Sequence, residues 1–479
     1  MKKLKILFAT SEAVPFVKTG GLADVAGSLP KSLLKLGADI RVIMPKFKSI
    51  PAKFLDKMEF LGNTYVDIGW RHQYCGVFKL VNEGVTFYFI DNKYYFDRDG
   101  YYGYPDEAEQ YVFLNKAILE AIPIIDFKPD IIHSNDWQTS LIALYLDANY
   151  KGNELYKGIR TAFTIHNLKY QGVFPKSILT DLMGIGWEYF TPDKIEFFDQ
   201  VNFMKAGLVY SNVITTVSKT YSEEIKYDFY GENLAEVVRS RSANLYGILN
   251  GIDFEENDPA TDKRLFANYD AANIEGKFVN KKMLQQTLGL PECADVPIMG
   301  IISRLVDQKG FDLIAYVLRD ILEEDIQLVI LGTGEHKYEE MFKHAALTYP
   351  KKVSSNIKYD ATLAQRIYAG CDMFLMPSLF EPCGLSQLFS LRYGTIPIVR
   401  ETGGLQDTIQ PFNEYIGEGN GFSFHNYNAH DMLYTIRRAI TFYYNTKIWH
   451  TLIRRGMSQD FSWNKSAKEY MDLYLKLVK

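Results

Sequence analysis

The sequence predicts an α/β protein made of two doubly wound halves, and three observations support this. Short apolar strands alternate with amphipathic helical stretches along the whole chain. This alternation restarts after about residue 290, as expected for a second half of the same type. The chain has 479 residues, a length typical of about two to three domains. Strands that alternate with helices predict parallel sheets covered on both faces.

The first half begins with an apolar strand at 5–10 and a helix at 22–36. The apolar residues of that helix recur at helical spacing, and Gly37 is expected to end it. Each later strand is a short apolar run bounded by polar or turn residues. These strands are expected at 39–44, 85–90, 130–133, 161–165 and 213–217.

In the second half, strands are expected at 296–302, 327–331, 372–376 and 396–399, with a helix at 311–322. Segment 250–280 is rich in Asp, Asn and Gly and has weak periodicity, so we place the interdomain connection there. The tail is helical by its apolar spacing. The predicted organisation is therefore a first domain at 1–250, a second at 251–463 and a terminal helix at 464–479.

Composition excludes several classes of function. The net charge is −5 and no basic block stands out, which disfavours nucleic-acid or membrane-surface binding. Cys75, Cys293, Cys371 and Cys383 form no Cys-x-x-Cys pair, so structural zinc has little support. Four scattered thiols suit a reducing compartment. No apolar run approaches the roughly 18 residues needed to cross a bilayer, and we expect a cytoplasmic location.

Polar and glycine-rich residues follow almost every predicted strand. In doubly wound sheets, ligands bind outside the carboxyl ends of the strands. We therefore expect one ligand-binding edge in each half. The segments at these edges are 18–24, 135–137, 166–167, 304–310, 332–335, 378–385 and 402–404.

Three of these segments have the chemistry of an anion site. Lys18-Thr19-Gly20-Gly21 leads into a helix, where glycines allow close backbone approach and N–H groups favour negative charge. Thr402-Gly403-Gly404 follows the same logic. Arg304 and Lys309 follow a strand and suit a diphosphate, because Arg offers a planar fork and Lys a mobile charge. The alternative interpretation is tight turns with solvated cations.

Other candidates are single residues with open alternatives. Glu381 lies in a loop bounded by proline and glycine, where it could bind sugar hydroxyls or only interact with a helix N-terminus. His166 and Asp136 each end a predicted strand, and either could be structural. Trp137 beside a carboxylate suits a sugar but could equally belong to the core.

Several motifs of other enzyme classes are missing. Gly332-Thr333-Gly334 is not a Gly-x-Gly-x-x-Gly motif, and the chain contains no P-loop sequence. A dinucleotide-dependent oxidoreductase is therefore disfavoured. No Asp-x-Asp motif follows a predicted strand, so we expect neither an obligatory metal nor another cofactor.

Taken together, these motifs resemble those of bacterial glycogen synthases and plant starch synthases, which are retaining glucosyltransferases of the GT-B fold. The resemblance spans essentially the whole chain, and several spaced matches in the expected order make it specific. The similar segments are KTGGLADV at 18–25, NDW at 135–137, HN at 166–167, NGID at 250–253, SRLVDQKG at 303–310, FEPCGL at 380–385 and YGTIPIVRETGGLQDT at 393–408.

The resemblance implies two Rossmann-like domains facing across a deep cleft, with ADP-glucose as donor and an α-1,4-glucan as acceptor. It also implies that the terminal helix packs back on the first domain. Among the donor-binding residues, Arg304 and Lys309 would hold the diphosphate, and Lys18 would contact the phosphates or the sugar. The motif that contains Lys18 also contains Thr19, Gly20, Gly21 and Asp24. Backbone N–H donors would come from Gly21, Thr402, Gly403 and Gly404.

Further roles follow from the same resemblance. Glu381, Cys383, Gly384 and Leu385 would hold the glucosyl group, and Tyr359 would pack on the adenine. Asp136, His166 and Asn250 would line the cleft near the reacting sugar. Related GT-B enzymes often have a second glutamate at the position of Phe389, so ribose recognition must come from elsewhere.

The expected mechanism is transfer to the 4-hydroxyl with retention. Domain closure would exclude water, and the cations would stabilise charge on departing ADP. Asp136 is the nearest candidate for a carboxylate nucleophile, though we do not favour a double displacement. The alternatives are UDP-glucose or another acceptor, a glucan phosphorylase, and a silent protein that only binds nucleotide sugar or glucan.

Overall fold

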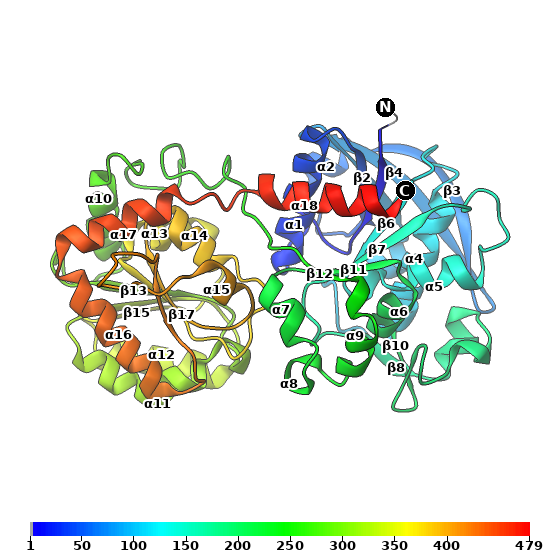
Figure 1. Ribbon diagram of the computed structural model, residues 1–479. Helices are drawn as coiled ribbons and strands as arrows, with labels where there is room; N and C mark the ends of the chain where they lie inside the picture. Colours follow the sequence, from blue (N-terminus) through cyan, green and yellow to red (C-terminus); the bar gives the residue numbers. More distant parts are fainter. Residues whose placement is uncertain (1–2) are drawn as a thin grey trace. The chain divides into compact units, whose positions relative to one another are not determined.

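The computed structural model describes residues 3–479, which form two compact units. Unit 1 runs to Gly251 and resumes at Trp463–Lys479, while unit 2 is Ile252–Ser462 (Figure 1). The segment 250–280 was expected to be the connection, and this is wrong beyond Gly251. Its later part folds into unit 2, where the Asp262 carboxylate accepts a 2.7 Å hydrogen bond from the Tyr393 hydroxyl.

The large sheet of unit 1 has strand order β12-β11-β7-β6-β1-β2-β5-β4-β3. Most neighbours are parallel, but β4 runs antiparallel to both β3 and β5. The expected all-parallel sheet is therefore extended by an antiparallel hairpin that the apolar pattern did not reveal. In sheet order the strands are Leu245–Gly247, Val213–Thr216, Arg160–Ile165, Ile131–Asn135, Lys5–Ala9, Asp39–Pro45, Val85–Asp91, Arg71–Asn82 and Glu59–Ile68. A small separate sheet contains β8 (Val173–Pro175), β10 (Gln200–Asn202) and β9 (Glu196–Phe197).

The helices of unit 1 cover both faces of its large sheet. The connection through α1 runs from β1 toward β2, whereas those through α4, α5 and α6 run the opposite way along the sheet. Because such crossovers are right-handed, the two directions place helices on opposite faces. The helices are α1 (Gly21–Lys35), α2 (Ala52–Leu55), α3 (Lys93–Phe96), α4 (Glu107–Ala121), α5 (Leu141–Ala148), α6 (Phe203–Tyr210), α7 (Lys219–Glu224), α8 (Asp228–Gly231), α9 (Ala235–Ser240) and α18 (Trp463–Leu477).

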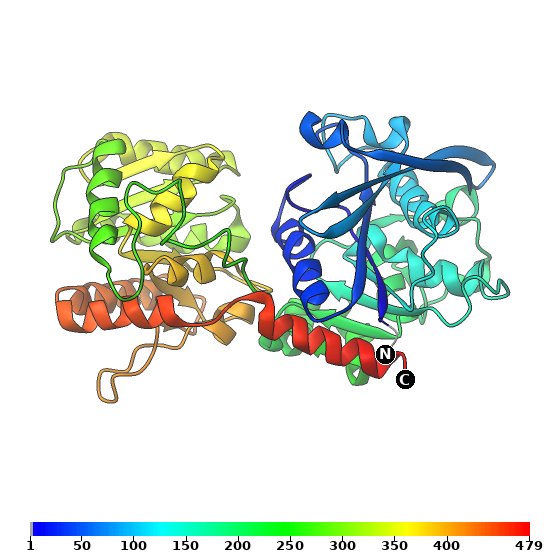
Figure 2. The same cartoon turned by 90° about the horizontal axis from the view of Figure 1, so that it is seen from above.

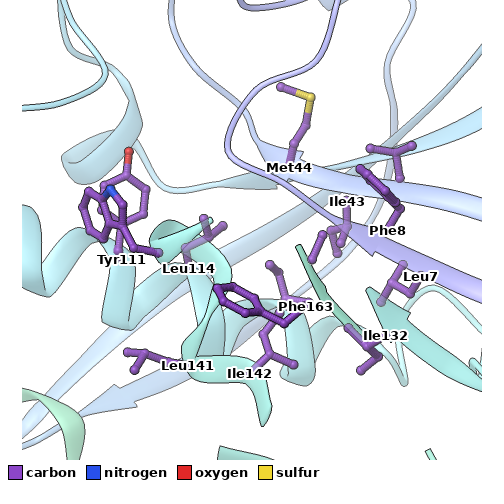
Figure 3. Packing of buried hydrophobic residues seen from close by; sticks show 14 of the residues in the cluster. Leu7, Phe8, Ile43, Met44, Tyr111, Leu114, Ile132, Leu141, Ile142 and Phe163 are labelled. Atoms are coloured by element: carbon purple, nitrogen blue, oxygen red, sulfur yellow. The ribbon is translucent and has the colours of Figure 1, made fainter. Parts of the chain in front are cut away.

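The core of unit 1 lies between the central strands and these helices. Figure 3 shows Phe8 of β1, Ile132 of β6 and Phe163 of β7 beside Leu114 of α4 and Leu141 of α5. All five side chains are fully buried. This packing fixes the strand ends from which the candidate residues of unit 1 project.

The terminal helix α18 belongs to unit 1 and packs on α1 (Figures 1 and 2). Its Tyr474 hydroxyl lies 2.6 Å from Nδ1 of His133 in β6, and Nε2 of His133 lies 2.6 Å from the Thr164 hydroxyl in β7. Burial lowers the pKa of His133 to about 3, so this ring is neutral. The tail thereby forms a polar contact with the central strands.

Unit 2 has a parallel sheet with strand order β15-β14-β13-β16-β17-β18. Helices α10, α13, α14 and α17 cover one face, and α11, α12 and α16 cover the other (Figure 1). The strands β13 to β18 are Ile298–Ile302, Gln327–Leu331, Val353–Asn356, Met373–Met376, Ile396–Arg400 and Phe422–Phe424. The helices α10 to α17 are Glu275–Thr287, Phe311–Glu323, His336–Thr348, Ala361–Gly370, Ser386–Arg392, Gly403–Thr408, Ala429–Tyr443 and Thr446–Ser458. None of the helices in residues 3–479 is long and apolar enough to span a membrane.

Candidate active site

Each sheet reverses its winding direction at one pair of neighbouring strands. In unit 1 this pair is β1 and β6, and in unit 2 it is β13 and β16. A doubly wound sheet binds ligands beyond the carboxyl ends of the strands at this point. The sequence candidates follow these strands: 18–24 after β1, Asp136 after β6, Arg304 and Lys309 after β13, and Glu381 after β16.

The glycine loop after β1 wraps around a carboxylate of the chain itself. Glu12, only 4% exposed, accepts hydrogen bonds from the backbone N–H of Thr19, from the Thr19 hydroxyl at 3.0 Å and from the Gly20 N–H at 3.3 Å. Burial raises the pKa of Glu12 despite these bonds. The Thr19 and Gly20 amides, expected to face a bound anion, are therefore occupied by Glu12. Gly21 starts α1, and N–H groups in a first turn have no partner within the helix.

Lys18 lies at the start of this loop and forms an ion pair with Asp24. Its Nζ is 2.7 Å from Oδ1 of Asp24, and the two side chains are 42% and 26% exposed. Burial raises the pKa of Asp24, and the Lys18 charge opposes that shift. The two motif residues thus position each other at the N-terminal end of α1, with the ammonium group accessible to solvent.

Asp136 joins the ends of β6 and β7. Its Oδ1 accepts the backbone N–H of His166 at 2.7 Å and that of Asn167 at 3.4 Å. The His166 ring places Nε2 3.0 Å from Oδ1 of Asn135. The backbone N–H of His166 therefore binds Asp136, and its ring contacts Asn135. Asp136 has a positive φ of 53°, a conformation that is uncommon outside glycine.

Burial shifts the pKa values of Asp136 and His166 in the directions that favour their neutral forms. The pKa of Asp136 rises to about 7, chiefly because of burial, with the charge of Glu12 acting in the same direction. The two N–H bonds to its carboxylate oppose that rise. Burial lowers the pKa of His166 to about 3. A neutral imidazole and a carboxyl that titrates near neutrality therefore lie together at this edge.

Asn250 lies one residue before Gly251, where the chain leaves unit 1, near the carboxyl edge of β11. Its backbone N–H donates to the Val217 carbonyl at 3.3 Å. The side chain is 5% exposed, and its Oδ1 has no hydrogen-bond partner among the described residues. Buried polar atoms are nearly always bonded, so this oxygen is suited to accept a bond from a ligand or water.

In unit 2, Lys309 and Glu381 form a close ion pair at the strand reversal. Lys309 Nζ lies 2.5 Å from Oε2 of Glu381, and the two side chains are 19% and 8% exposed. The Ser378 hydroxyl donates to the same Oε2 at 3.2 Å. The sequence assigned Lys309 to the diphosphate and Glu381 to the sugar. The structure brings the two assigned positions into direct contact.

Arg304 is exposed in the loop after β13. The loop is braced by the turn that follows β14, since the Leu305 N–H donates to the Thr333 carbonyl at 2.9 Å and the Glu335 N–H to the Leu305 carbonyl at 2.8 Å. The Gly332-Thr333-Gly334 turn, a weak phosphate signal in the sequence, therefore supports the loop that presents Arg304.

The turn 402–404 packs directly on the Glu381 loop. The Gly404 N–H donates to the carbonyls of Glu381 at 3.1 Å and Pro382 at 3.2 Å, so its expected role as a donor to the ligand is wrong. Gly403 has a φ of +45°, and a Cβ there would lie 2.0 Å from the Glu381 carbonyl oxygen. The turn fixes the backbone of Glu381. Thr402 is fully buried at the N-cap of α15.

The remaining sequence candidates in unit 2 differ in exposure. Cys383 is 5% exposed, and Gly384 and Leu385 lead into α14. Tyr359 is 82% exposed between β15 and α13, where its ring is accessible to a flat partner. Phe389 lies on α14 with its ring centre 5.7 Å from that of Tyr368, and it forms part of the packing around that helix.

Sequence reasoning missed two residues that shape these edges. Arg400 at the end of β17 donates to the carbonyls of Ser378 at 2.9 Å and Leu379 at 2.5 Å, and so orients the Glu381 loop. Its position two residues before Thr402 is the sequence feature that could have identified it. Glu12 was missed because its partners are loop amides, although it follows the first strand directly. Residues 3–479 place no group of three or more His, Cys, Asp or Glu where a metal ion could be held.

Comparisons with known proteins agree with this architecture. The model for the starch synthase catalytic domain matches residues 5–240, and the model for glycosyl transferases group 1 matches residues 290–446. The catalytic domain of starch synthase IV from Arabidopsis thaliana, solved with ADP and acarbose, has a TM-score of 0.93 and 33% identity over 100% of both chains. Sucrose-phosphate synthase from Thermosynechococcus elongatus, 16% identical with a TM-score of 0.62 over 99% of both chains, shares the GT-B fold.

Curated relatives match the chain from end to end. The glycogen synthases of Desulforamulus reducens and Clostridium novyi are each 55% identical to it over 99% of both chains. That of Bacillus cereus is 51% identical over 99% of this chain and 100% of its own. The chain belongs to the glycogen synthase family of GT-B glucosyltransferases.

Proposed function

We propose that the chain transfers glucose from ADP-glucose to the nonreducing-end 4-hydroxyl of an α-1,4-glucan with retention of configuration. The observation that supports this most strongly is the Lys309–Glu381 pair at the strand reversal of unit 2, with Arg304 exposed in the same loop. The related starch synthase IV was solved bound to ADP and acarbose, and ADP is the leaving group in this proposal.

Arg304 and Lys309 are proposed to bind the diphosphate and stabilise the negative charge that builds on the departing ADP. A guanidinium fork binds two phosphate oxygens at once, and an ammonium group adds a mobile charge. Donors already fixed where charge develops make the largest contribution to such catalysis. Lys18 and the N–H of Gly21 are proposed to assist from unit 1, with Asp24 holding the Lys18 ammonium in place.

Glu381 is proposed to bind hydroxyls of the glucosyl group. Lys309 compensates its buried charge, since an unpaired buried carboxylate is costly. When the donor binds, Lys309 can share its three N–H groups between Glu381 and the phosphates. The charge of Glu381 would also favour the oxocarbenium-like sugar of the transition state. Cys383, Gly384, Leu385, Thr402 and Gly403 shape this loop, and Tyr359 is proposed to pack on the adenine.

In unit 1, the His166 ring and Asn250 are proposed to bind the reacting sugar. The neutral imidazole offers a nitrogen to a hydroxyl, and Oδ1 of Asn250, which has no partner within residues 3–479, can accept a hydrogen bond. Asp136 is proposed to position the His166 segment through its two N–H bonds. A double displacement through Asp136 is disfavoured, because its pKa of about 7 leaves much of it protonated at neutral pH. Attack of the acceptor from the leaving-group face then gives retention.

We propose that the reaction needs no metal ion or other cofactor, because Arg304 and Lys309 can supply the positive charge that a metal supplies elsewhere. Transfer rates with and without EDTA test this. Equal rates are expected, and a loss that added magnesium restores would refute it.

Donor competition tests the proposed substrate. Incorporation of labelled glucose into glycogen should be much faster from ADP-glucose than from UDP-glucose, and an enzyme specific for α-1,4 linkages should release the label. A preference for UDP-glucose would establish the alternative donor. Binding of ADP without any transfer would favour a silent binding protein.

A further inference from the structure

Asn135, the last residue of β6, connects three strand ends at the winding reversal of unit 1. Its side chain is fully buried. Nδ2 donates to the carbonyl of Ala9, the last residue of β1, at 3.0 Å and to the carbonyl of His133 at 3.3 Å. Oδ1 lies 3.0 Å from Nε2 of His166, the residue that follows β7. The backbone N–H donates to the Thr139 hydroxyl at 2.7 Å, so every polar group of this side chain and its own N–H are bonded.

The partners of Asn135 fix the direction of its bond to His166. A backbone carbonyl accepts hydrogen bonds and cannot donate them. The carbonyls of Ala9 and His133 therefore hold the NH2 group of Asn135, and the amide oxygen faces the imidazole ring. Because an amide oxygen only accepts, Nε2 of His166 must carry a proton and donate it to Oδ1.

The proton on Nε2 determines what the other ring nitrogen of His166 can do. Burial lowers the pKa of His166 to about 3, so near neutral pH the ring carries a single N–H. Nδ1 is then unprotonated and offers a lone pair, and no group within residues 3–479 donates a hydrogen bond to it. In a neutral histidine the bond made by one nitrogen sets the state of the other. Asn135 thereby makes Nδ1 a hydrogen-bond acceptor.

A lone pair on Nδ1 of His166 suits a hydroxyl and not a phosphate. The diphosphate of a nucleotide sugar is ionised near neutral pH, so its oxygens only accept hydrogen bonds. A sugar hydroxyl can donate one. A ring with a pKa of about 3 also has no second proton to give to a departing group. His166 is therefore suited to accept from a sugar and not to act as a general acid.

We propose that Asn135 is a positioning residue for the transfer, which holds the His166 ring so that Nδ1 accepts a hydrogen bond from a hydroxyl of the reacting sugar. Asn135 acts through His166 and does not itself contact the sugar. This inference rests on the proposed function, which places that sugar beside His166. A ring fixed before the substrate binds lowers the cost of reaching the reactive geometry.

The kinetic test of Asn135→Ala needs a control that loses a similar set of hydrogen bonds elsewhere. Asn280 in α10 of unit 2 is also fully buried. Its Nδ2 donates to the carbonyls of Ala267 at 2.6 Å and Gly276 at 2.8 Å, and its Oδ1 accepts the Phe266 N–H at 3.0 Å. Asn280→Ala therefore removes two amide–carbonyl bonds and one bond to an N–H, as Asn135→Ala does.

With ADP-glucose and glycogen, Asn135→Ala should lower kcat roughly 10–10²-fold, because the His166 ring is no longer held in place. The dissociation constant of ADP, which has no glucosyl group, should stay at the wild-type value. Asn280→Ala should keep the wild-type kcat. In a His166→Ala background, Asn135→Ala should cause no further loss, since the two residues act as one unit. Wild-type kcat in Asn135→Ala, or an equal loss in both backgrounds, would overturn the proposal.

Nitrogen-15 NMR of protein labelled at histidine measures the tautomer directly and requires no turnover. The His166 signals are those absent from His166→Ala. The wild type should carry the proton on Nε2, and Asn135→Ala should populate both tautomers. A proton on Nδ1 in the wild type would overturn the inference, whether or not Asn135→Ala folds. The expected tautomer in a protein that transfers no glucose would instead refute the proposed function and leave the Asn135–His166 bond established.

Discussion

The Nζ atom of Lys309 lies 2.5 Å from Oε2 of Glu381, although 72 residues separate the two in sequence. One follows β13 and the other β16, the two strands at which unit 2 reverses its winding. The pair brings a cation suited to phosphate and a carboxylate suited to sugar hydroxyls to one point. It therefore couples the two functions proposed for this half of the site.

Breaking this pair should reduce stability as well as activity. Lys309→Ala leaves the Glu381 carboxylate, on a side chain that is 8% exposed, without its cation, and removing one partner of a buried pair costs about 3–5 kcal/mol. The double variant Lys309→Ala/Glu381→Gln removes the buried charge and should regain most of that loss in thermal unfolding. Neither variant should transfer glucose at more than a small fraction of the wild-type rate. Full activity in Lys309→Ala would contradict the assigned role.

Arg304→Ala should separate catalysis from folding. The side chain is exposed, so the change in unfolding free energy should stay within about 0.5 kcal/mol. Loss of a donor to the departing diphosphate should lower kcat about 10²–10³-fold. Arg319→Ala is the matched control, because this arginine of unit 2 is 84% exposed and pairs with Glu323. Comparable rates for the two variants would argue against diphosphate binding by Arg304.

Asp136→Asn should change how stability depends on pH. Burial raises the pKa of Asp136 from 3.8 to about 7. Between these values the folded protein holds a proton that the unfolded chain has released, so this group makes stability fall as pH rises. The full shift corresponds to roughly 4 kcal/mol at about 1.36 kcal/mol per unit.

The side-chain amide introduced by Asp136→Asn can still accept the two N–H bonds but does not titrate. The thermal midpoint of this variant relative to the wild type should therefore increase between pH 5 and pH 8. Asp99→Asn removes a carboxylate that is 93% exposed and serves as the control, with a constant difference from the wild type. A constant difference for Asp136→Asn as well would show that this carboxyl is not held in its protonated form.

Gly403→Ala should lower the activity because it displaces the backbone of Glu381. The added Cβ would lie 2.0 Å from the Glu381 carbonyl oxygen, so the loop must move. Gly417→Ala is the control, because it has a similar positive φ of 71° but no atom within 4 Å of the added carbon. Both variants should lose about 1–2 kcal/mol from left-handed strain. Only Gly403→Ala should lower kcat, by at least tenfold, and equal activities would separate the turn from catalysis.

The sequence predicts where most strands end, but it does not predict which distant residues contact each other. Apolar runs such as 327–331 mark buried parallel strands, and the polar residues after them mark the ligand edge. The hairpin of β3 and β4 was missed because exposed aromatic residues such as Phe60 and Tyr65 obscure the apolar pattern, although burial alternates over residues 63–68 of β3. The pairing of Lys309 with Glu381 depends on how the strands assemble, which local spacing does not encode. The capture of the Thr19 and Gly20 amides by Glu12 depends on the path of the loop between them, which the residue types alone do not fix.

Transfer of glucose from ADP-glucose to a glucan can be measured directly. The most direct measurement is to quantify, in one reaction containing EDTA, both the ADP released and the labelled glucose incorporated into glycogen. We expect one glucosyl unit to be incorporated for each ADP released, with both signals lost in Glu381→Gln. Release of ADP without incorporation, or incorporation unaffected by Glu381→Gln, would contradict it.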